Sequence, residues 1–381
     1  MKVLLLFIAT IVVLVLGAFF YIPSYINKKI TAAINDNTEF SLNIGQVSFT
    51  GYHSLELSAI TLQHKLNRDD YIKSKGFQTD WISCKINAVI IDGINWKQLL
   101  SDKNIFSEKL RIHSPDIYIF RDKRVPSKYK YTALPAAMLR EMKFPFSIPV
   151  TEIEHGKIIY EELAKENGEK IKVSFDHLFA TIHHMSSDPL YLLTQPILSI
   201  EAKASILDSV KTVIRYSANT LNPDNVFSFE GHTQSFSAKL LNKCITPATN
   251  VIIDDGFVNS IHFKFIAHEN EANGTINMDY KDLKLKVLKK ITNEDEADTK
   301  FHKKHRFNSF ITNLFVRNED KKDPNPAIKH IPRNTPMVNN HTGKIHFVRR
   351  KDRFIFNYWW NSFKSGITAT VLEVPAEKLK K

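Results

Sequence analysis

The sequence contains few cysteines and none of the cysteine patterns that mark common scaffolds. Its 381 residues include only Cys84 and Cys244, which lie far apart and form no CxxC pair. A disulfide framework and a cysteine-based zinc site are therefore excluded. We expect both cysteines to be small buried hydrophobic side chains.

Motifs of the common enzyme classes are also missing. No GxGxxG, GxxxxGK[ST], GxSxG or HExxH motif occurs. His183 and His184 would point to opposite faces of a strand and so cannot hold one metal ion. His302 and His305 lack a carboxylate at a useful spacing, and the run 254–256 (Asp-Asp-Gly) is typical of a turn. We predict no catalytic residue, no cofactor and no metal ligand, and hence a protein that is not an enzyme.

The net charge of +12 is compatible with nucleic acid, a bilayer surface or lipid head groups. However, no RRM, KH, zinc-finger or helix-turn-helix signature accompanies the basic residues. The densest basic clusters lie at 121–130, 302–306 and 349–353, and ordinary solvated surface is the default interpretation of each. We predict no nucleic-acid partner.

Only one hydrophobic run is long enough to cross a membrane. Val3 to Ile22 carries no charged side chain, and as a helix it would be about 30 Å long. A cleaved signal peptide is the alternative, but the run exceeds the ~7 to 15 apolar residues of such a peptide. Basic residues flank both sides, so they do not decide the orientation. The residues predicted to form this membrane anchor include Val3, Leu6, Ile11, Val15, Phe19 and Ile22.

The pattern changes from helix to strand after the anchor. Ile22, Ile26, Ile30 and Ile34 recur every four residues, which predicts an amphipathic stem that ends within 35–37. Apolar residues then alternate with a period of two. The phase shifts at Gly45, near Ala59 and near Asp282, as expected for β-bulges in a curved sheet.

Six segments follow from these patterns, with a short helix expected at 94–100. Residues 261–265 and 276–280 predict a hairpin with a turn at 270–274, and 345–347 and 354–358 predict a second one. The segments are a transmembrane anchor and stem (1–36), an N-terminal β-rich segment (37–125), a proline-rich basic connection (126–150), a central curved β-sheet (151–291), polar and partly disordered loops (292–341), and a C-terminal hairpin and tail (342–381).

Several stretches resemble the AsmA-like proteins of bacterial envelopes, including their shorter relatives of unknown function. The resemblance lies in the anchor and in residues 44–62, 110–122, 144–162, 274–288 and 356–367. It implies a mainly β (α+β) fold, in which an N-terminal transmembrane helix precedes a long, twisted, curved antiparallel sheet that forms an open groove, with a few short helices. It also implies a single-pass protein of the bacterial inner membrane with its body in the periplasm.

The apolar face of such a sheet has two interpretations. The 26 phenylalanines could fill an ordinary closed core, or they could line a trough for acyl chains. The sequence alone does not separate these, and the resemblance favours the trough. The residues predicted to line it are Phe263, Phe265, Ile276, Met278, Tyr280, Phe354 and Phe356.

The leading hypothesis is a membrane-anchored protein that binds or conducts phospholipid and contributes to outer-membrane homeostasis. Its predicted partners are membrane lipid, the inner membrane through the N-terminal helix, and a second envelope protein. The alternative is a structural or assembly factor of the envelope, in which the basic residues at 121–130 or 349–353 contact a partner protein.

Overall fold

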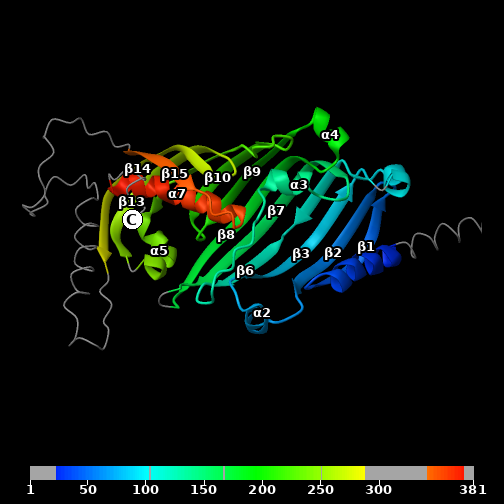
Figure 1. Ribbon diagram of the computed structural model, residues 1–381, viewed down its shortest axis with the longest axis horizontal. Helices are drawn as coiled ribbons and strands as arrows, with labels where there is room; N and C mark the ends of the chain where they lie inside the picture. The colour runs from blue at the N-terminus through cyan, green and yellow to red at the C-terminus, as the bar shows by residue number, and fades with distance from the viewer. Residues whose placement is uncertain (1–22, 103, 166–167, 250, 288–340, 373–381) are drawn as a thin grey trace, which may run out of the picture.

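The computed structural model describes residues 23–102, 104–165, 168–249, 251–287 and 341–372. The described residues are mainly β, with 15 strands joined in one mixed sheet and only a few helices. Figure 1 shows this sheet as a twisted, curved layer that extends from β1 at one end to β14 and β15 at the other.

The elements follow one another along the chain with short helices between the strands. The strands are β1 (Phe40–Gly51), β2 (Ser54–His64), β3 (Asp80–Asp92), β4 (Ile105–Phe106), β5 (Lys109–His113), β6 (Asp116–Asp122), β7 (Phe146–Leu163), β8 (Lys170–Ser186), β9 (Ile197–Ile206), β10 (Val210–Asn219), β11 (Phe227–Thr233), β12 (Phe236–Ser237), β13 (Val251–Ala267), β14 (Glu271–Val287) and β15 (His341–Val348). The helices are one over residues 23–37, α2 (Arg68–Lys75), the π-helical turn η1 (Gln98–Asp102), α3 (Pro135–Arg140), α4 (Pro189–Thr194), the 3-10 turn η2 (Ala238–Leu241), α5 (Asn242–Thr249) and α7 (Ile355–Leu372).

Most neighbouring strands are consecutive and antiparallel, but the sheet is mixed rather than wholly antiparallel. The strands β4, β5 and β6 each run parallel to β7. The two short strands β5 and β6 both pair with β3, one after the other, and so occupy the place of a single strand between β3 and β7. The prediction of a fully antiparallel sheet is wrong here, because nothing in the alternation of a strand tells its direction.

This parallel pairing explains the proline-rich connection. Parallel neighbours cannot be joined by a hairpin, because the chain must return along the whole strand before it pairs again. Residues 123–145 make that return between β6 and β7 and include α3 (Figure 1). The side-chain amide of Gln78 holds the start of the connection by donating to the carbonyls of Lys123 and Val125, at 3.1 and 3.0 Å. The predicted end of this segment at 150 is late, because β7 begins at Phe146.

One face of the sheet is apolar, and we call it the inner face. In register across β10, β11 and β13, Tyr216, Phe229 and Phe265 lie side by side on it and belong to the largest core cluster. The alternate residues of the same strands are charged. On the opposite, outer face, Arg215 and Lys264 each form an ion pair with Glu230.

The helix over residues 23–37 covers the inner face at the β1 end. Ile26 and Ile30 pack against a buried cluster that includes Ile44 and Ile60. The helix also closes the open edge of β1, because the Asn35 side chain accepts a hydrogen bond from the Leu42 amide at 2.6 Å and donates to its carbonyl at 3.2 Å. The predicted amphipathic stem and its end at 35–37 are confirmed.

The helix α7 covers the inner face at the β15 end. Its buried residues include Ile355, Tyr358, Ser362 and Thr370, spaced by three, four and eight positions as one helical face requires. The predicted strand at 354–358 is therefore wrong. Its alternation is misleading, because the same residues also carry a helical spacing, and in the structure Ile355 and Tyr358 are buried on one face of α7.

Two glycines bring α7 close to the sheet. A Cβ atom on Gly366 would lie 2.6 Å from Cγ1 of Ile345 and 2.8 Å from Cγ2 of Ile276. A Cβ atom on Gly343 of β15 would lie 2.5 Å from the carbonyl oxygen of Gly366. The helix backbone thus rests directly on β14 and β15.

The predicted phase shifts are real features of the strands. Ala59 and Asp282 both have positive φ angles, 51° and 53°, in the middle of β2 and β14. The register between β13 and β14 is also irregular near Gly256, so the predicted turn at 254–256 is a bulge within β13. The register of β13 with β14 shifts around Gly256 and Asp282, as β-bulges require. At Ala59, β2 keeps its register with both β1 and β3, so the β-bulge predicted there is wrong although the backbone is irregular.

The other predicted segments have mixed outcomes. The hairpin of 261–265 with 276–280 is confirmed, although its turn lies at 268–270. The strands of the segments predicted at 37–125 and 151–291 belong to one continuous sheet. The predicted anchor residues lie outside the described residues, as does nearly all of 292–341. Within the described ranges, no helix has the length and hydrophobicity needed to cross a bilayer.

An aromatic cluster lies where α2 meets the ends of β1 and β2. The His64 ring lies 4.2 Å from that of Phe40 and 4.0 Å from that of Tyr71, measured between centroids. His64 is 4% exposed. Burial lowers the pKa of His64 and outweighs the opposing effects of the Asp80 backbone and the Glu39 carboxylate.

Candidate functional site

The inner face has a half-buried apolar region between its two covered ends. In register across β3, β6, β7 and β8, one row contains Ile82, Ile119, Tyr160 and Val173, and the next contains Cys84, Ile117, Ile158 and Phe175. We define the central strip as the half-buried isoleucine, leucine and cysteine side chains on the inner face of β3, β5, β6 and β7 that do not pack against a buried core cluster. These are Ile82, Cys84, Leu110, Ile112, Ile117, Ile119, Ile153 and Ile158.

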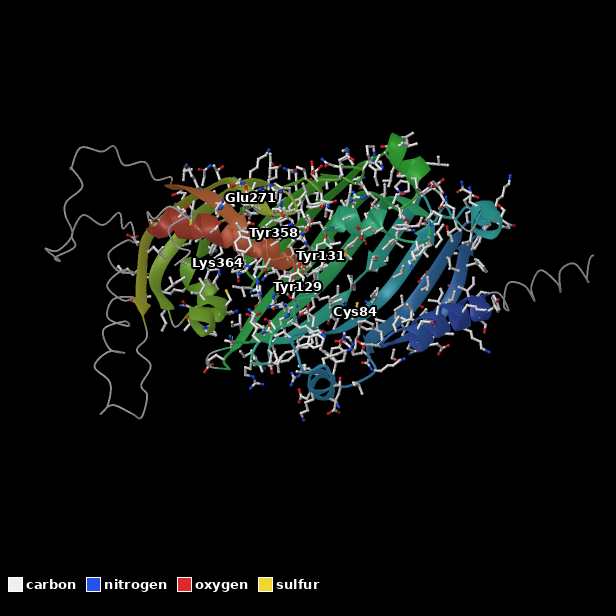
Figure 2. The ribbon with its side chains drawn as sticks, viewed as in Figure 1. Cys84, Tyr129, Tyr131, Glu271, Tyr358 and Lys364 are labelled. Carbon is white, nitrogen blue, oxygen red and sulfur yellow. The ribbon has the colours of Figure 1, made fainter. Side chains whose placement is uncertain are left out.

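None of the central strip residues belongs to a buried core cluster of the described chain. The helix over 23–37 packs on one side of the strip, and α3 and α7 pack on the other side. Figure 2 labels Cys84 within this middle region and Lys364 on α7. The strip is thus apolar surface that the helices of the described ranges leave only partly covered.

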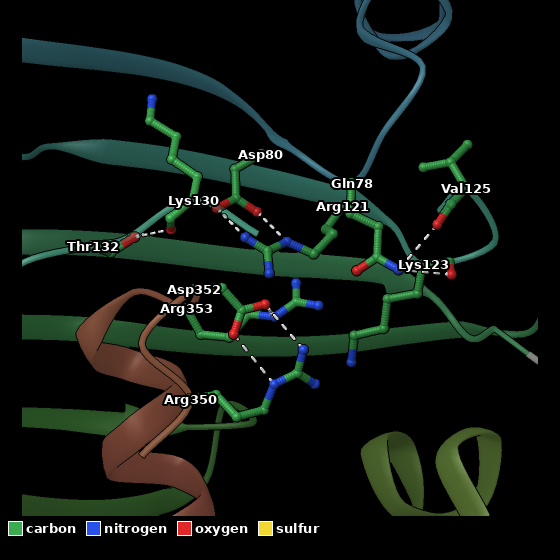
Figure 3. Close-up of polar contacts among 10 residues, drawn as sticks. All are labelled: Gln78, Asp80, Arg121, Lys123, Val125, Lys130, Thr132, Arg350, Asp352 and Arg353. Atoms are coloured by element: carbon green, nitrogen blue, oxygen red, sulfur yellow. Dashed lines mark hydrogen bonds and ion pairs between the residues drawn. The ribbon is translucent and has the colours of Figure 1, made fainter. Parts of the chain in front are cut away.

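A row of charged residues ends the central strip. Asp80, Arg121 and Glu162 are in register across β3, β6 and β7, two positions along each strand from Ile82, Ile119 and Tyr160. The Arg121 guanidinium donates two hydrogen bonds to Asp80, both of 2.6 Å (Figure 3). Lys123 Nζ lies 2.5 Å from Glu162 Oε1, and the Tyr160 hydroxyl donates to Glu162 Oε2 at 2.6 Å.

Further basic groups approach this row from the segment before α7 and from α7 itself. Asp352 Oδ2 lies 3.0 Å from Arg350 Nη2 and 3.3 Å from Arg353 Nε, so one carboxylate serves two guanidinium groups. Burial, together with Arg121 and Arg350, lowers the pKa of Arg353. Burial and Lys123 likewise lower the pKa of Lys364, although part of its long side chain stays in solvent.

We call this group of residues the basic cluster. Its basic members outnumber its carboxylates, so the end of the central strip carries a local positive surplus. The basic cluster consists of Arg121, Lys123, Arg350, Arg353 and Lys364 with the carboxylates Asp80, Glu162 and Asp352.

The residues predicted to line a groove lie elsewhere, and most are not accessible. Five of them are buried in the largest core cluster, and Ile276 is 0% exposed. Phe354 and Phe356 are exposed around the start of α7 and lie outside the sheet. The prediction of an accessible lining is wrong for the buried five, because they form part of the largest core cluster, to which α7 contributes Ile355 and Tyr358. The residues concerned are Phe263, Phe265, Ile276, Met278 and Tyr280.

The histidines and cysteines considered as ligands do not form a metal site within the described ranges. His184 Nδ1 is bonded to the Tyr191 hydroxyl at 2.8 Å, and the ring of His183 lies 6.2 Å from that of His184. His302 and His305 lie outside the described residues. Cys84 and Cys244 are both free thiols, and burial raises the pKa of each.

Many residues of the two described basic segments are engaged within the chain. Arg124 pairs with Asp122 at 2.7 Å, and Arg349 pairs with Glu269 at 2.6 Å. Only 1% of the Arg349 side chain is exposed. These pairs hold the connection and the start of α7 in place.

Comparisons with known protein families and with curated proteins find no match for this chain. The resemblance to AsmA-like proteins therefore stays a prediction from the sequence.

Proposed function

We propose that the central strip binds the acyl chains of a membrane phospholipid, and that the protein binds or conducts lipid and catalyses no reaction. In this proposal the run at 3–22 tethers the protein to the bacterial inner membrane with its body in the periplasm. There it contributes to outer-membrane homeostasis, as AsmA-like proteins are expected to do.

The main support is the position of the central strip. Its side chains form contiguous apolar rows, they are half-buried and keep part of their surface in solvent, and helices flank them on both sides. Moving hydrocarbon out of water onto such a surface is worth roughly 0.8 kcal/mol for each CH₂ fully buried. A face this apolar between polar surroundings is typical of a ligand or partner site.

Cys84 allows a direct test, because it lies in the strip and the only other cysteine is Cys244. In full-length Cys244→Ser protein, purified in mild detergent, phosphatidylglycerol should slow alkylation of Cys84 by a maleimide. Phospholipid should also be detected in the purified protein by mass spectrometry.

The matched control moves the thiol by one residue to the opposite face. In Cys84→Ser/Cys244→Ser protein that also carries Ser83→Cys, the thiol points away from the strip. Its alkylation should be insensitive to lipid. Equal protection at both positions, or no protection at Cys84 and no lipid in the purified protein, would contradict lipid binding on this face.

A second candidate function is that of an assembly factor, and an exposed apolar rim favours it. The rim lies at one end of β4, β7, β9 and β10. Contacts from Ile105 to Pro145, from Ser187 to Phe144 and from Thr220 to Pro196 hold its parts together. Leu190 and Leu193 of α4 are 76% and 71% exposed. The rim residues are Ile105, Met138, Met142, Phe144, Leu190, Leu193, Ile197 and Leu221.

Replacement of both α4 leucines separates the two functions. The Leu190→Ser/Leu193→Ser protein should keep its lipid if the strip is the site. If the rim instead binds a protein of the envelope, this variant should lose a chemical cross-link to that partner in intact cells. Retention of every cross-link would argue against the assembly function.

A further inference from the structure

We infer that the basic cluster is the subsite for the phosphate-bearing head group of the lipid whose chains lie on the central strip. This inference rests on the proposed function and adds a ligand class to it. The shared chemistry is a phosphate mono- or diester anion, which either a phospholipid or free phosphate could supply.

The register places the cluster at the end of the strip. Arg121 follows Ile119 by two positions on β6, and Asp80 precedes Ile82 by two positions on β3. Both residues therefore lie on the inner face, next to the apolar rows. An amphiphile whose chains cover the strip has its head group at this row if it lies along the strands.

The charges of the cluster are unequally compensated. Arg121 is fully paired with Asp80, but Asp352 is shared by Arg350 and Arg353. The Arg353 residue is 9% exposed, and its Nε has only the ion-pair contact of 3.3 Å with the shared Asp352, which lacks hydrogen-bond geometry. A guanidinium that is removed from water in this way favours a second anion, since bidentate Arg–phosphate pairs are among the strongest charged hydrogen bonds.

The start of α7 also favours the binding of an anion at the basic cluster. The helix begins at Ile355, two residues after Arg353, and runs for 18 residues. The N-terminus of a helix carries a partial positive charge that stabilises anions. Lys364, further along α7, faces Lys123 and Glu162 from the same side.

A purely structural network is the competing explanation. In that case, the cluster only fastens the start of α7 to the sheet. Neutralising Arg353 would then lower stability but would not change the preference of the protein for one lipid head group over another. Measuring the preference for one lipid head group over another therefore separates the two explanations.

The test compares two fluorescent lipids with identical chains, phosphatidylglycerol and diacylglycerol, on the full-length protein in mild detergent. Arg353→Gln and Lys364→Gln should each weaken binding of phosphatidylglycerol by roughly tenfold, the equivalent of one charged hydrogen bond, and leave diacylglycerol binding unchanged. Lys364→Gln keeps the test valid if Arg353→Gln does not fold, because Lys364 is an exposed position. Arg215→Gln on the outer face is the matched control and should change neither affinity.

The outcomes separate this inference from the proposed function. If neither lipid binds the wild-type protein, the proposed function fails and the inference fails with it. If both lipids bind and the variants change neither affinity, lipid binding stands and the head-group subsite is wrong. If inorganic phosphate binds as tightly as phosphatidylglycerol and displaces it, the anion is free phosphate, and the assignment to a lipid is overturned.

Discussion

Asp80 and Arg121 face each other across β3 and β6, joined by two hydrogen bonds of 2.6 Å. The side chains are 26% and 14% exposed, so water screens the pair only weakly. Removing one member of such a pair leaves an uncompensated charge, whereas removing both does not. This asymmetry gives the first prediction.

Asp80→Asn should lower the free energy of unfolding by about 2 kcal/mol, measured by urea denaturation. The double variant Asp80→Asn/Arg121→Gln should be less destabilised than the single one. Asp255→Asn is the control, because its ion pairs with Lys239 and Lys284 are half exposed, and it should change stability by less than about 0.5 kcal/mol. Equal losses for the single and double variants would show that the pair is not coupled.

Gly366→Ala should destabilise the protein even though it lies in a helix. Alanine would normally gain about 1 kcal/mol over glycine in a helix interior. Here its Cβ would clash with Ile345 and Ile276, and overpacking of this kind costs about 1 to 3 kcal/mol. Gly51→Ala, whose nearest neighbour would be 3.9 Å away, is the control. A thermal melt in which Gly366→Ala is the more stable of the two would refute the close contact of α7.

His64 should make stability depend on pH in mildly acidic solution. Its pKa is lowered in the folded protein, so between about pH 6.5 and that lower value the unfolded chain binds a proton that the folded chain does not. The free energy of unfolding should therefore fall as the pH drops below about 6.5. His64→Phe should remove this part of the dependence in urea titrations run at about pH 7.5 and about pH 5.5, on either side of the ordinary histidine pKa. A wild-type protein equally stable at both values would contradict the prediction.

Ile119→Ser should reduce the amount of co-purifying phospholipid severalfold, because it places a hydroxyl in the middle of the central strip. The fold should survive, since Ile119 is only half buried. Ile159→Ser makes the same change on the opposite face of β7 and is the matched control. Similar lipid content in both variants, measured by mass spectrometry, would place the lipid elsewhere.

The sequence predicted the fold best where one short-range pattern decides the structure. The spacing of Ile26 and Ile30 correctly predicts one face of a helical stem, and the alternation in 261–265 and 276–280 correctly predicts a hairpin. The prediction failed around Phe354 and Phe356, where a strand alternation and a helical spacing overlap in the same residues. Only the contact of α7 with β14 and β15 decides between them.

The candidate site was harder to predict, because it depends on register. Arg121 continues the alternation of Ile117 and Ile119, yet the charge pattern groups it with the basic residues at 121–130 and favours ordinary solvated surface. Asp80 and Glu162 continue two other strands in the same way, and each looks like an ordinary charged strand end. Their meeting in one row follows from the parallel pairing of β6 with β7, which the sequence does not encode locally.

From β7 onward, most strands take their place in the sheet in the same order as in the chain. A hairpin could therefore be removed from, or added to, the part between β8 and β11 without rerouting any other connection. Each such step would change the width of the sheet by about 10 Å, two interstrand spacings. Evolution or design could thus change the width of the sheet in steps, while the helix over 23–37 and α7 keep their contacts with its two ends.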